Sequence, residues 1–295
     1  MAIVRPKKKK LGDVLTDSFL STLLIVLTIV CIYPFWHVLM YSLSDSRASM
    51  SGGLFLLPKE FTLEAYRVTF KTKKLFVAIG NSVLKTVVGT AVALVLTSLM
   101  AYPLSREELR GRRIVLFYVY FTMLFSGGII PTYLIVKDVG LLDSFWAYII
   151  PSAMSAYHMF ILRNFFASTP KSLPESAMLD GANPMQILWH IMLPLAKPAY
   201  ATITLYTVQS CWNSYMDGVL YITSSKLEIL QVYLRRMIAA SGALVEMAGF
   251  NTENTISEET AKMTVIAISA IPVTLVYLFL QKYFQKGLNV GAVKG

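Results

Sequence analysis

The stretch "PESAMLDGANPMQILWHIMLPL", residues 174–195, lies between two apolar runs that are each long enough to cross a membrane. It carries two carboxylates, a Gly, an Asn-Pro pair and two further Pro residues, which would all disturb a helix within the bilayer. Ser172 and Glu175 have the spacing of a capping box, with Pro174 in the first helical turn. Gly181 can adopt the left-handed conformation that ends a helix. A short helix is therefore predicted between Ser172 and Gly181.

A second short helix is predicted directly after this turn. Asn183 can cap it, Pro184 suits its first position, and Gln186 can return the capping hydrogen bond. Pro194 and Pro198 mark where the chain changes direction and enters the bilayer again. A helix, a tight turn and a helix between two membrane spans favour mechanical contact with another protein, and the alternative is a plain intracellular loop.

The composition is that of a polytopic membrane protein. Of the 295 residues, 55% are hydrophobic and only 15% are charged, which is too apolar for an ordinary soluble domain. A helix needs roughly 20 mainly apolar residues to cross the hydrocarbon core, and an all-α structure is expected because backbone groups in lipid must be satisfied within the segment. Six spans are predicted, near residues 19–43, 77–101, 114–136, 144–166, 199–222 and 264–284.

Basic residues predict the orientation of these spans. The N-terminal "RPKKKK" (5–10) and the short loop "SREELRGRR" (105–113) would lie on one side, which the positive-inside rule assigns to the cytoplasm. Six spans then place both termini in the cytoplasm. Residues 44–78 resist this orientation, because they would face outward although they carry six basic residues. The net charge of +10 has two open explanations: anionic lipid at the inner surface, or attraction of an acidic solute or partner outside.

The chain is expected to form one transmembrane domain, residues 19–295, after a basic N-terminal tail of residues 1–18. Two extracytoplasmic loops are predicted at about 44–76 and 223–263, and the cytoplasmic loop with the opening stretch at about 170–194. No internal repeat is visible, whereas a carrier that alternates access alone usually contains two related halves. The chain is therefore expected to supply half of a pathway that a partner completes.

Two further segments have open interpretations. In the third predicted span, Gly127, Gly128 and Pro131 interrupt the helix, and they indicate either a hinge that lines the pathway or close helix packing through glycine. Residues 226–240, "KLEILQVYLRRMIAA", have roughly helical spacing of apolar residues and predict an amphipathic helix on the outer surface. This helix would lie in the membrane interface or form part of a platform for an external partner.

The punctuated stretch resembles the conserved cytoplasmic loop of binding-protein-dependent ABC importer permeases. That loop reads Glu-Ala-Ala, three residues, Gly, nine residues, Ile, one residue, Leu-Pro. The one departure here is a Ser for the second Ala, which keeps a small residue. The matching positions in this sequence are Glu175, Ser176, Ala177, Gly181, Ile191, Leu193 and Pro194.

The resemblance extends over most of the chain. Residues 125–144, 212–222 and 281–295 look like the branch that imports oligosaccharides. Within that branch the chain is most similar to permeases for acidic sugars and complex glycans, including the second permease subunit of an alginate importer. The resemblance implies the type I ABC importer permease fold, with six transmembrane helices, in the inner membrane of a bacterium.

The resemblance also implies a mechanism and partners. A coupling helix would sit in a groove of a cytoplasmic ATPase subunit, and closure of two such subunits around ATP and Mg²⁺ would turn the pathway outward. The further partners implied are a second homologous permease, an extracytoplasmic solute-binding protein, an oligosaccharide and membrane lipid, and no nucleic acid. The chain is not expected to be an enzyme or to bind ATP, since it contains no Gly-x4-Gly-Lys-Ser/Thr phosphate loop. No metal or other cofactor is expected in it, since the sequence has no metal-ligand spacing and its three histidines are scattered.

Within the coupling loop, Glu175 is expected to contact a basic group of the ATPase, and local helix capping is its competing role. Gly181 would fix the turn, while Ala177 and Met178 would pack into the groove. The full set expected to couple to the ATPase is Glu175, Ser176, Ala177, Met178, Asp180, Gly181 and Ala182.

The fifth predicted span supplies candidates for the substrate pathway. A sugar face stacks on an aromatic ring while its hydroxyls need amide or carboxylate partners, although such residues can equally join helices to one another. Lys85 could help to bind a uronate, and Asp217 argues against a simple anionic-sugar site near it. The candidates are Tyr206, Gln209, Trp212, Asn213, Tyr215, Asp217 and Lys85.

Two other classes of function remain as alternatives. One is an integral membrane enzyme that acts on a glycan, for which the sequence offers no converging set of acid, base or metal-binding residues. The other is a channel or secondary carrier that works alone. The lack of internal repeats and the complete coupling-loop pattern both count against that class.

Overall fold

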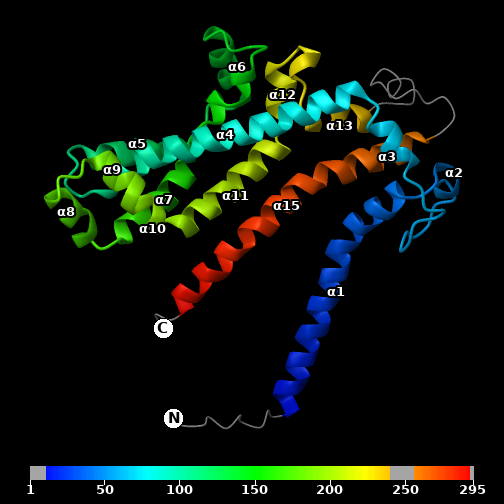
Figure 1. Ribbon diagram of the computed structural model, residues 1–295, viewed down its shortest axis with the longest axis horizontal. Coiled ribbons are helices and arrows are strands. Elements are labelled where there is room, and N and C mark those ends of the chain that lie inside the picture. Colours follow the sequence, from blue (N-terminus) through cyan, green and yellow to red (C-terminus); the bar gives the residue numbers. More distant parts are fainter. Residues whose placement is uncertain (1–10, 240–255, 293–295) are drawn as a thin grey trace. The chain divides into compact units, whose positions relative to one another are not determined.

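The chain folds into helices joined by loops, as the computed structural model shows for residues 11–239 and 256–292 (Figure 1). Within these residues there is no strand, and the one isolated β-bridge joins Ser44 and Phe61. The expected all-α class is confirmed. The chain divides into two compact units, one formed by residues 1–71 with 245–268 and the other by residues 72–244 with 269–295.

The first unit is built on the long helix α1, Leu11–Ser42. The predicted basic tail, residues 1–18, is therefore helical from Leu11 onward, and residues 1–10 lie outside the described part. After α1 the chain forms α2 (Ser46–Ser49) and α3 (Glu64–Thr69), and the unit also contains the start of α15 (Glu258–Ala292). A small core joins the end of α1 to the loop after α2, through Met40, Tyr41 and Phe55 with Met263 against them.

The second unit is built on α4, Lys73–Ser105, whose 33 residues extend about 50 Å. Two helices pack along it, α7 (Ala156–Ser168) and α11 (Lys197–Asn213). One reason for this close packing is a row of small buried side chains on α4, because small residues let helix backbones approach. At Gly89 a Cβ atom would lie only 3.2 Å from Sγ of Cys211. The row consists of Gly89, Ala93, Thr97 and Ala101.

Shorter elements gather at the two ends of α4 (Figure 1). At the Ser105 end lie the start of α5 and the helices between α7 and α11, and at the Lys73 end lie α12 and α13. The remaining elements of this unit are α5 (Arg112–Leu124), α6 (Ile129–Asp138), the 3₁₀ helices Phe145–Tyr148, Ile150–Ser152 and Ser225–Leu227, α8 (Ser172–Leu179), α9 (Pro184–Ile187), the π-helix Leu188–Met192, α10 (Leu193–Leu195), α12 (Met216–Tyr221) and α13 (Leu230–Ala239).

The predicted spans all fall on helices, but only three of them are unbroken. By length and composition, three described helices could each cross a membrane, Leu15–Ser42, Lys73–Ser105 and Glu258–Phe279, or up to five if each of two bent helix pairs forms one span. The predicted span 199–222 begins with α11, whose 17 residues stand at the lower limit for crossing, and the chain then breaks at Ser214 before α12.

The third predicted span, 114–136, is not one continuous helix. Helices α5 and α6 are bent by 117° at residues 125–128. Gly128 has φ +85° and caps α6, and Pro131 in the first turn of α6 has no N–H to continue a helix from α5. Gly127, Gly128 and Pro131 therefore turn the chain sharply, which is a larger change of direction than a hinge within a straight span needs.

The predicted fourth span and the predicted amphipathic helix also differ in detail from expectation. Residues 145–152 are 3₁₀ helices, and they meet α7 at an angle of 53°.

The predicted amphipathic helix forms as α13, and its apolar side is buried against α4 of the same unit. A role in the membrane interface would need that side to be free, so the packing favours the platform interpretation. The buried residues of α13 are Leu230, Val232, Tyr233 and Met237.

Candidate functional site

The punctuated stretch forms a hairpin of two short helices, and its turn is fixed by backbone hydrogen bonds. Gly181 has φ +86°, as predicted for the residue that ends the first helix. The N–H of Ala182 donates to the carbonyl of Ala177 at 2.9 Å, and the N–H of Gly181 donates to that of Met178 at 3.0 Å. This pair of bonds is the Schellman motif, which satisfies carbonyls that a helix end leaves free.

The second helix of the hairpin begins with the predicted capping box. The N–H of Asn183 donates to Oε1 of Gln186 at 2.8 Å, and the N–H of Gln186 donates to Oδ1 of Asn183 at 2.9 Å. The π-helix that follows carries this end of the hairpin into the core, where Ile187, Leu188 and Met192 are almost fully buried. The hairpin is therefore held at both its turn and its base.

The first helix does not begin with the predicted capping box. Helix α8 starts at Ser172, and the residue at its cap, Lys171, already has a helical backbone and makes no side-chain cap bond. Ser172 lies inside the helix, so its hydroxyl does not occupy the cap position, and the N–H of Glu175 donates to the carbonyl of Lys171. Glu175 therefore has no capping role here, and its exposed carboxylate stays available for another contact.

Apolar side chains project from the turn of the hairpin. Leu179 is 90% exposed and Met178 is 47% exposed, which is costly for apolar groups in water unless another surface covers them. Ala177 and Ala182 instead lie inward, against the core of this chain. Of the two side chains expected to pack into an ATPase groove, Met178 points outward in this structure and Ala177 points inward. The remaining members of the predicted coupling set, Ser176 and Asp180, are exposed.

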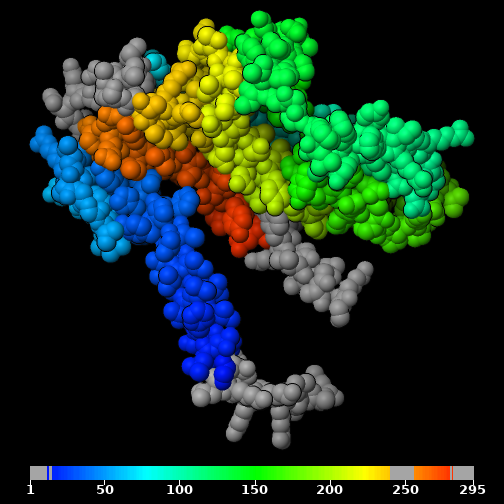
Figure 2. Space-filling view, turned by 180° about the vertical axis from the view of Figure 1, so that it is seen from behind, coloured from blue at the N-terminus to red at the C-terminus, as the bar shows by residue number. Residues whose placement is uncertain are grey.

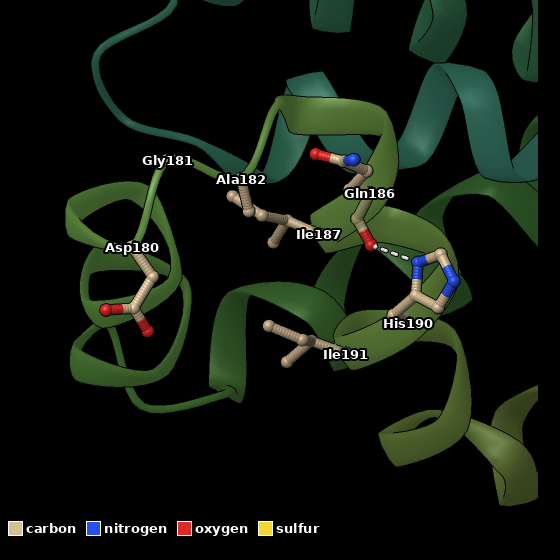
Figure 3. Close-up of a pocket in the computed structure, with 7 residues that line it drawn as sticks. All are labelled: Asp180, Gly181, Ala182, Gln186, Ile187, His190 and Ile191. Carbon is tan, nitrogen blue, oxygen red and sulfur yellow. Dashed lines mark hydrogen bonds between the residues drawn. The ribbon is translucent and has the colours of Figure 1, made fainter.

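A hollow of about 370 Å³ lies inside the hairpin (Figure 3). It is lined from one side by Asp180, Gly181 and Ala182 and from the other by Gln186 and His190, together with Ile187 and Ile191. A hydrogen bond of 3.0 Å joins Nδ1 of His190 to the carbonyl oxygen of Gln186. A second, more apolar groove of about 680 Å³ lies between the hairpin and the end of α4, where Glu175 and Met178 line it together with Arg106.

Charged groups tie the hairpin to the loop after α4. Lys171, at the start of α8, forms an ion pair with Glu107, with 2.5 Å between Nζ and Oε2. This contact lowers the pKa of the Glu107 carboxyl below its usual value and raises that of the Lys171 ammonium. At the end of α4, Nε of Arg112 and Nε of Arg163 both donate to the carbonyl of Leu104, as cations do at a helix C-terminus.

Three of the predicted pathway residues share one exposed face of α11. Tyr206, Gln209 and Asn213 are three and four residues apart, which places them on the same side of the helix, and all three are exposed in this chain. The ring of His158, on α7, stacks on that of Tyr206 with 6.1 Å between centroids. Sequence reasoning assigned no role to this histidine, because a stacking partner on another helix leaves no local pattern.

Two other predicted pathway residues are engaged in contacts within the chain. The indole of Trp212 is 3% exposed, and its Nε1 donates to the carbonyl of Ser269 at 2.9 Å, which joins α11 to α15. The ring of Tyr215 is half-buried beneath the guanidinium of Arg235 at 4.4 Å. For this pair the structure favours the alternative left open above, in which polar and aromatic residues hold helices together.

The last two candidates, Lys85 and Asp217, are paired with each other. Their charged atoms Nζ and Oδ2 lie 2.6 Å apart, and the side chains are only 2% and 17% exposed. Oδ1 of Asp217 also accepts hydrogen bonds from the hydroxyl of Ser214 and from the N–H of Gly218. The lysine is therefore not a free cation for a uronate, and the aspartate is not a free anion.

A polar clamp surrounds this ion pair and was not predicted. Nδ2 of Asn81 donates to the carbonyls of Lys226 and Glu228, and the hydroxyl of Ser82 accepts from the N–H of Leu230. The hydroxyl of Tyr148 donates to the carbonyl of Leu227. The clamp holds the segment before α13 against α4. Its partners lie between 79 and 148 residues apart in sequence, and short-range patterns do not report such pairs.

The comparisons with known proteins cover most of the chain. A family model described as "Binding-protein-dependent transport system inner membrane component" matches residues 93–290. The polygalacturonan/rhamnogalacturonan transport system permease protein YtcP of Bacillus subtilis (strain 168) is 45% identical, over 98% of this chain and 100% of the relative. Protein LplC of the same organism is 42% identical over 90% of each chain.

The fold is also similar to that of solved structures. A chain from the crystal structure of a bacterial ABC transporter involved in the import of the acidic polysaccharide alginate superimposes with a TM-score of 0.88. It is 35% identical in sequence, and the match covers 95% of this chain and 100% of that chain. A chain from an alginate transporter crystallised with a pentasaccharide-bound periplasmic protein has a TM-score of 0.60 at 15% identity, which is a likeness of fold alone.

Proposed function

This chain belongs to the family of binding-protein-dependent transport system inner membrane components, and on that premise we propose that it is the permease subunit of an ATP-driven importer of uronate-containing oligosaccharides. The function is alternating access of a membrane pathway. It requires a partner that supplies energy and a segment through which the partner's motion reaches the membrane helices.

The observation that carries the proposal is the hairpin of α8 and α9. Its turn is fixed by the Schellman motif at Gly181, its second helix by the capping box, and its base by the burial of Ile187 and Leu188. Such a segment transmits a displacement of its tip to α4 and α7, because those helices form the core in which its base is packed. A loop held only at its two ends would absorb the displacement instead.

The partner at this tip would be a cytoplasmic ATPase subunit. The exposed Met178 and Leu179 would fill an apolar groove of that subunit. The carboxylate of Glu175, which takes no part in capping α8, would meet a basic group at the edge of that groove. ATP and Mg²⁺ would be bound by two such subunits and not by this chain. Both termini and the hairpin would then lie in the cytoplasm, in agreement with the basic residues of the 105–113 loop.

The substrate class rests on two relatives of high coverage. One is named for the transport of polygalacturonan and rhamnogalacturonan, and the other takes part in the import of alginate, an acidic polysaccharide. In this chain the exposed face of Tyr206, Gln209 and Asn213 offers an aromatic surface and amide groups, which suit the ring and the hydroxyls of a sugar. The carboxylates of the substrate would find their cations elsewhere, since Lys85 is paired.

A second homologous permease would complete the pathway, and a solute-binding protein would deliver the substrate. The face of α11 that carries Tyr206 is exposed in the isolated chain, as expected of a surface that borders a pathway between two subunits. Neither the membrane helices nor the hairpin supplies a phosphate-binding loop, so the chain itself would not hydrolyse ATP.

ATP hydrolysis by the assembled transporter in lipid vesicles tests this proposal. The chain is co-purified with its neighbouring permease and ATPase, and the binding protein is added empty, loaded with a neutral oligosaccharide or loaded with an oligogalacturonate. Stimulation by the oligogalacturonate-loaded protein alone is expected. Equal stimulation by the neutral sugar would overturn the substrate class, and a rate indifferent to every loaded binding protein would overturn the importer function.

A further inference from the structure

A loop in the first unit turns back along α1, and its leucine side chains point outward. It follows α2 and contains the sequence Leu-Phe-Leu-Leu at 54–57, preceded by Gly52 and Gly53 at φ +64° and +98°. Leu54 and Leu57 are each 74% exposed and Leu56 is 63% exposed. Figure 2 shows this light-blue segment beside the end of α1.

The ends of this loop are closed by hydrogen bonds. The N–H of Asp45 donates to the carbonyl of Lys59, and the N–H of Lys59 donates to the hydroxyl of Ser44. Further along, the N–H of Thr62 donates to the carbonyl of Leu43. The loop is thus a compact surface loop with ends held together.

Phe55 fixes which side chains face outward. It is 1% exposed and lies against His37 and Tyr41 of α1, with ring centroids 5.2 and 4.8 Å apart. The ammonium of Lys59 lies over the same ring, 4.7 Å from its centroid, and donates to the hydroxyl of Ser51. Because Phe55 is held inward in this way, the leucines on both sides of it project away from the core.

The depth of the loop follows from a second contact with α1. Nε1 of Trp36 donates to the carbonyl of Leu56 at 3.0 Å, so Leu56 lies beside Trp36 and not beyond the end of the helix. Trp36 stands six residues before Ser42, where α1 ends, which corresponds to about 9 Å along the helix axis. Trp36 lies inside the segment Leu15–Ser42, which is long and apolar enough to cross a membrane. The loop therefore lies beside the last two turns of this apolar helix, where apolar side chains of an interfacial segment would meet lipid.

From this geometry we propose that the loop of residues 50–57 is an interfacial anchor that inserts Leu54, Leu56 and Leu57 into the lipid leaflet in which α1 ends. The indole N–H of Trp36 is used within the chain, and its ring is partly exposed at the same level, where aromatic residues prefer the membrane interface. The three leucines continue the apolar surface of the span.

Charge complementarity favours lipid as the occupant. Arg47 and Lys71 are exposed in the same unit, in segments that flank the loop, and anionic headgroups attract such cations, whereas the exposed Arg67 is paired with Glu64. The exposed residues at 54–57 are aliphatic only, whereas the centres of protein interfaces are enriched in Trp, Tyr and Arg. This pattern of aliphatic residues beside cations is typical of segments that lie on a membrane.

Nitroxide accessibility in the assembled transporter tests the anchor. Leu54→Cys and Leu57→Cys are made separately in a background of Cys31→Ala and Cys211→Ala, spin-labelled, and reconstituted in vesicles of phosphatidylethanolamine and phosphatidylglycerol. Arg47→Cys, on α2, is the matched control. At both leucine positions, collisions with oxygen are expected to exceed those with a water-soluble nickel chelate, and at Arg47 the order is expected to reverse.

Each other outcome would overturn the proposal. High collision rates with the nickel chelate at positions 54 and 57 would place the loop in water. Low rates with both reagents would show that protein covers the leucines, as a second permease or a binding protein would. Both leucines are highly exposed in the chain, so labelling them does not disturb a packed core, and size-exclusion chromatography of the labelled complex verifies its assembly.

Discussion

Lys85 of α4 and Asp217 of α12 form a buried ion pair, with 2.6 Å between Nζ and Oδ2. The lysine ammonium also faces the ring of Tyr148, 4.9 Å from its centroid. Each charge is therefore compensated within the chain. A buried pair of this kind adds little net stability, but removal of one member leaves an uncompensated charge, which is costly.

Replacement of one member should therefore harm the protein more than replacement of both. Asp217→Asn keeps the acceptor for Ser214 and Gly218 but leaves the ammonium of Lys85 buried without its partner, so it should lower the free energy of unfolding by about 3–5 kcal/mol. The double variant with Lys85→Met should recover most of this loss. Denaturant unfolding of the complex in detergent measures both values.

The same variants separate a structural role from substrate binding. If the pair only holds α12 to α4, the double variant should transport an oligogalacturonate at the parent rate. A double variant that is stable but fails to transport would assign one of these charges to the pathway. A double variant no more stable than Asp217→Asn would contradict the coupling of the two charges.

Gly181→Val should uncouple the hairpin without a steric clash. A Cβ atom there would meet nothing within 4 Å, so the penalty expected comes from φ +86°, which costs a non-glycine residue roughly 1–2 kcal/mol, and a β-branched one more. The variant is expected to assemble, because α9 is anchored by its own core contacts, and to lose stimulation of ATP hydrolysis by the loaded binding protein.

Gly181→Asn is the matched control, since asparagine tolerates the left-handed conformation better than other side chains. It should retain most of the stimulation that Gly181→Val loses. Equal stimulation in the parent and in Gly181→Val would mean that the turn does not transmit motion.

Two glycines at the other end of the second unit should respond in opposite ways to alanine. At Gly218 a Cβ atom would lie 2.6 Å from Cγ2 of Val232, so Gly218→Ala should push α13 away from α12 and destabilise the unit by about 1–3 kcal/mol. At Gly80, inside α4, a Cβ atom meets nothing within 4 Å, and Gly80→Ala should stabilise the helix by up to about 1 kcal/mol.

Thermal unfolding of the two variants side by side measures this difference, and Val232→Ala provides a test of its cause. The added methyl at position 218 fits into the space that Val232→Ala opens, so the double variant should be more stable than Gly218→Ala alone. A Gly218→Ala variant as stable as the parent would show that α12 and α13 do not pack as closely as described.

The hairpin was largely predictable because its signals are local. Gly181 at a helix end and Asn183 three residues before Gln186 each act over one turn, and the structure contains both motifs. The failure at Ser172 has the same scale, since a helix that begins one residue earlier moves the serine from the cap into the first turn. A shift of one residue cannot be resolved from spacing.

The pathway candidates were harder to assign because their partners are distant in sequence. Lys85 and Asp217 are 132 residues apart, and only the folded chain reveals that the two charges neutralise each other. The sequence predicts that Trp212 stacks on a sugar, whereas in the structure its indole N–H donates a hydrogen bond to the carbonyl of Ser269. Composition identifies polar residues within an apolar helix, whereas their function depends on which neighbours they meet.

The ion pair between Glu107 and Lys171 should tie the hairpin to the loop after α4 over a defined range of pH. The pKa of Glu107 is lowered in the folded chain, so the pair stabilises the fold above the ordinary carboxyl value of 4.5 and loses this effect as the pH falls through the lowered value. The pKa of Lys171 is raised, so its contribution is complete below pH 10.5 and is lost as the pH rises through the raised value.

Glu107→Gln should therefore lower the unfolding temperature by a constant amount between pH 4.5 and 10.5, and by less in more acidic buffer. Glu108→Gln, at the neighbouring exposed position, should have a smaller effect, because its carboxylate acts on Lys171 only through a weaker charge interaction. Because both groups of the pair are exposed, high salt should reduce the difference in unfolding temperature between Glu107→Gln and the parent. A difference that persists at acidic pH and high salt would mean that Glu107 acts through packing instead of charge.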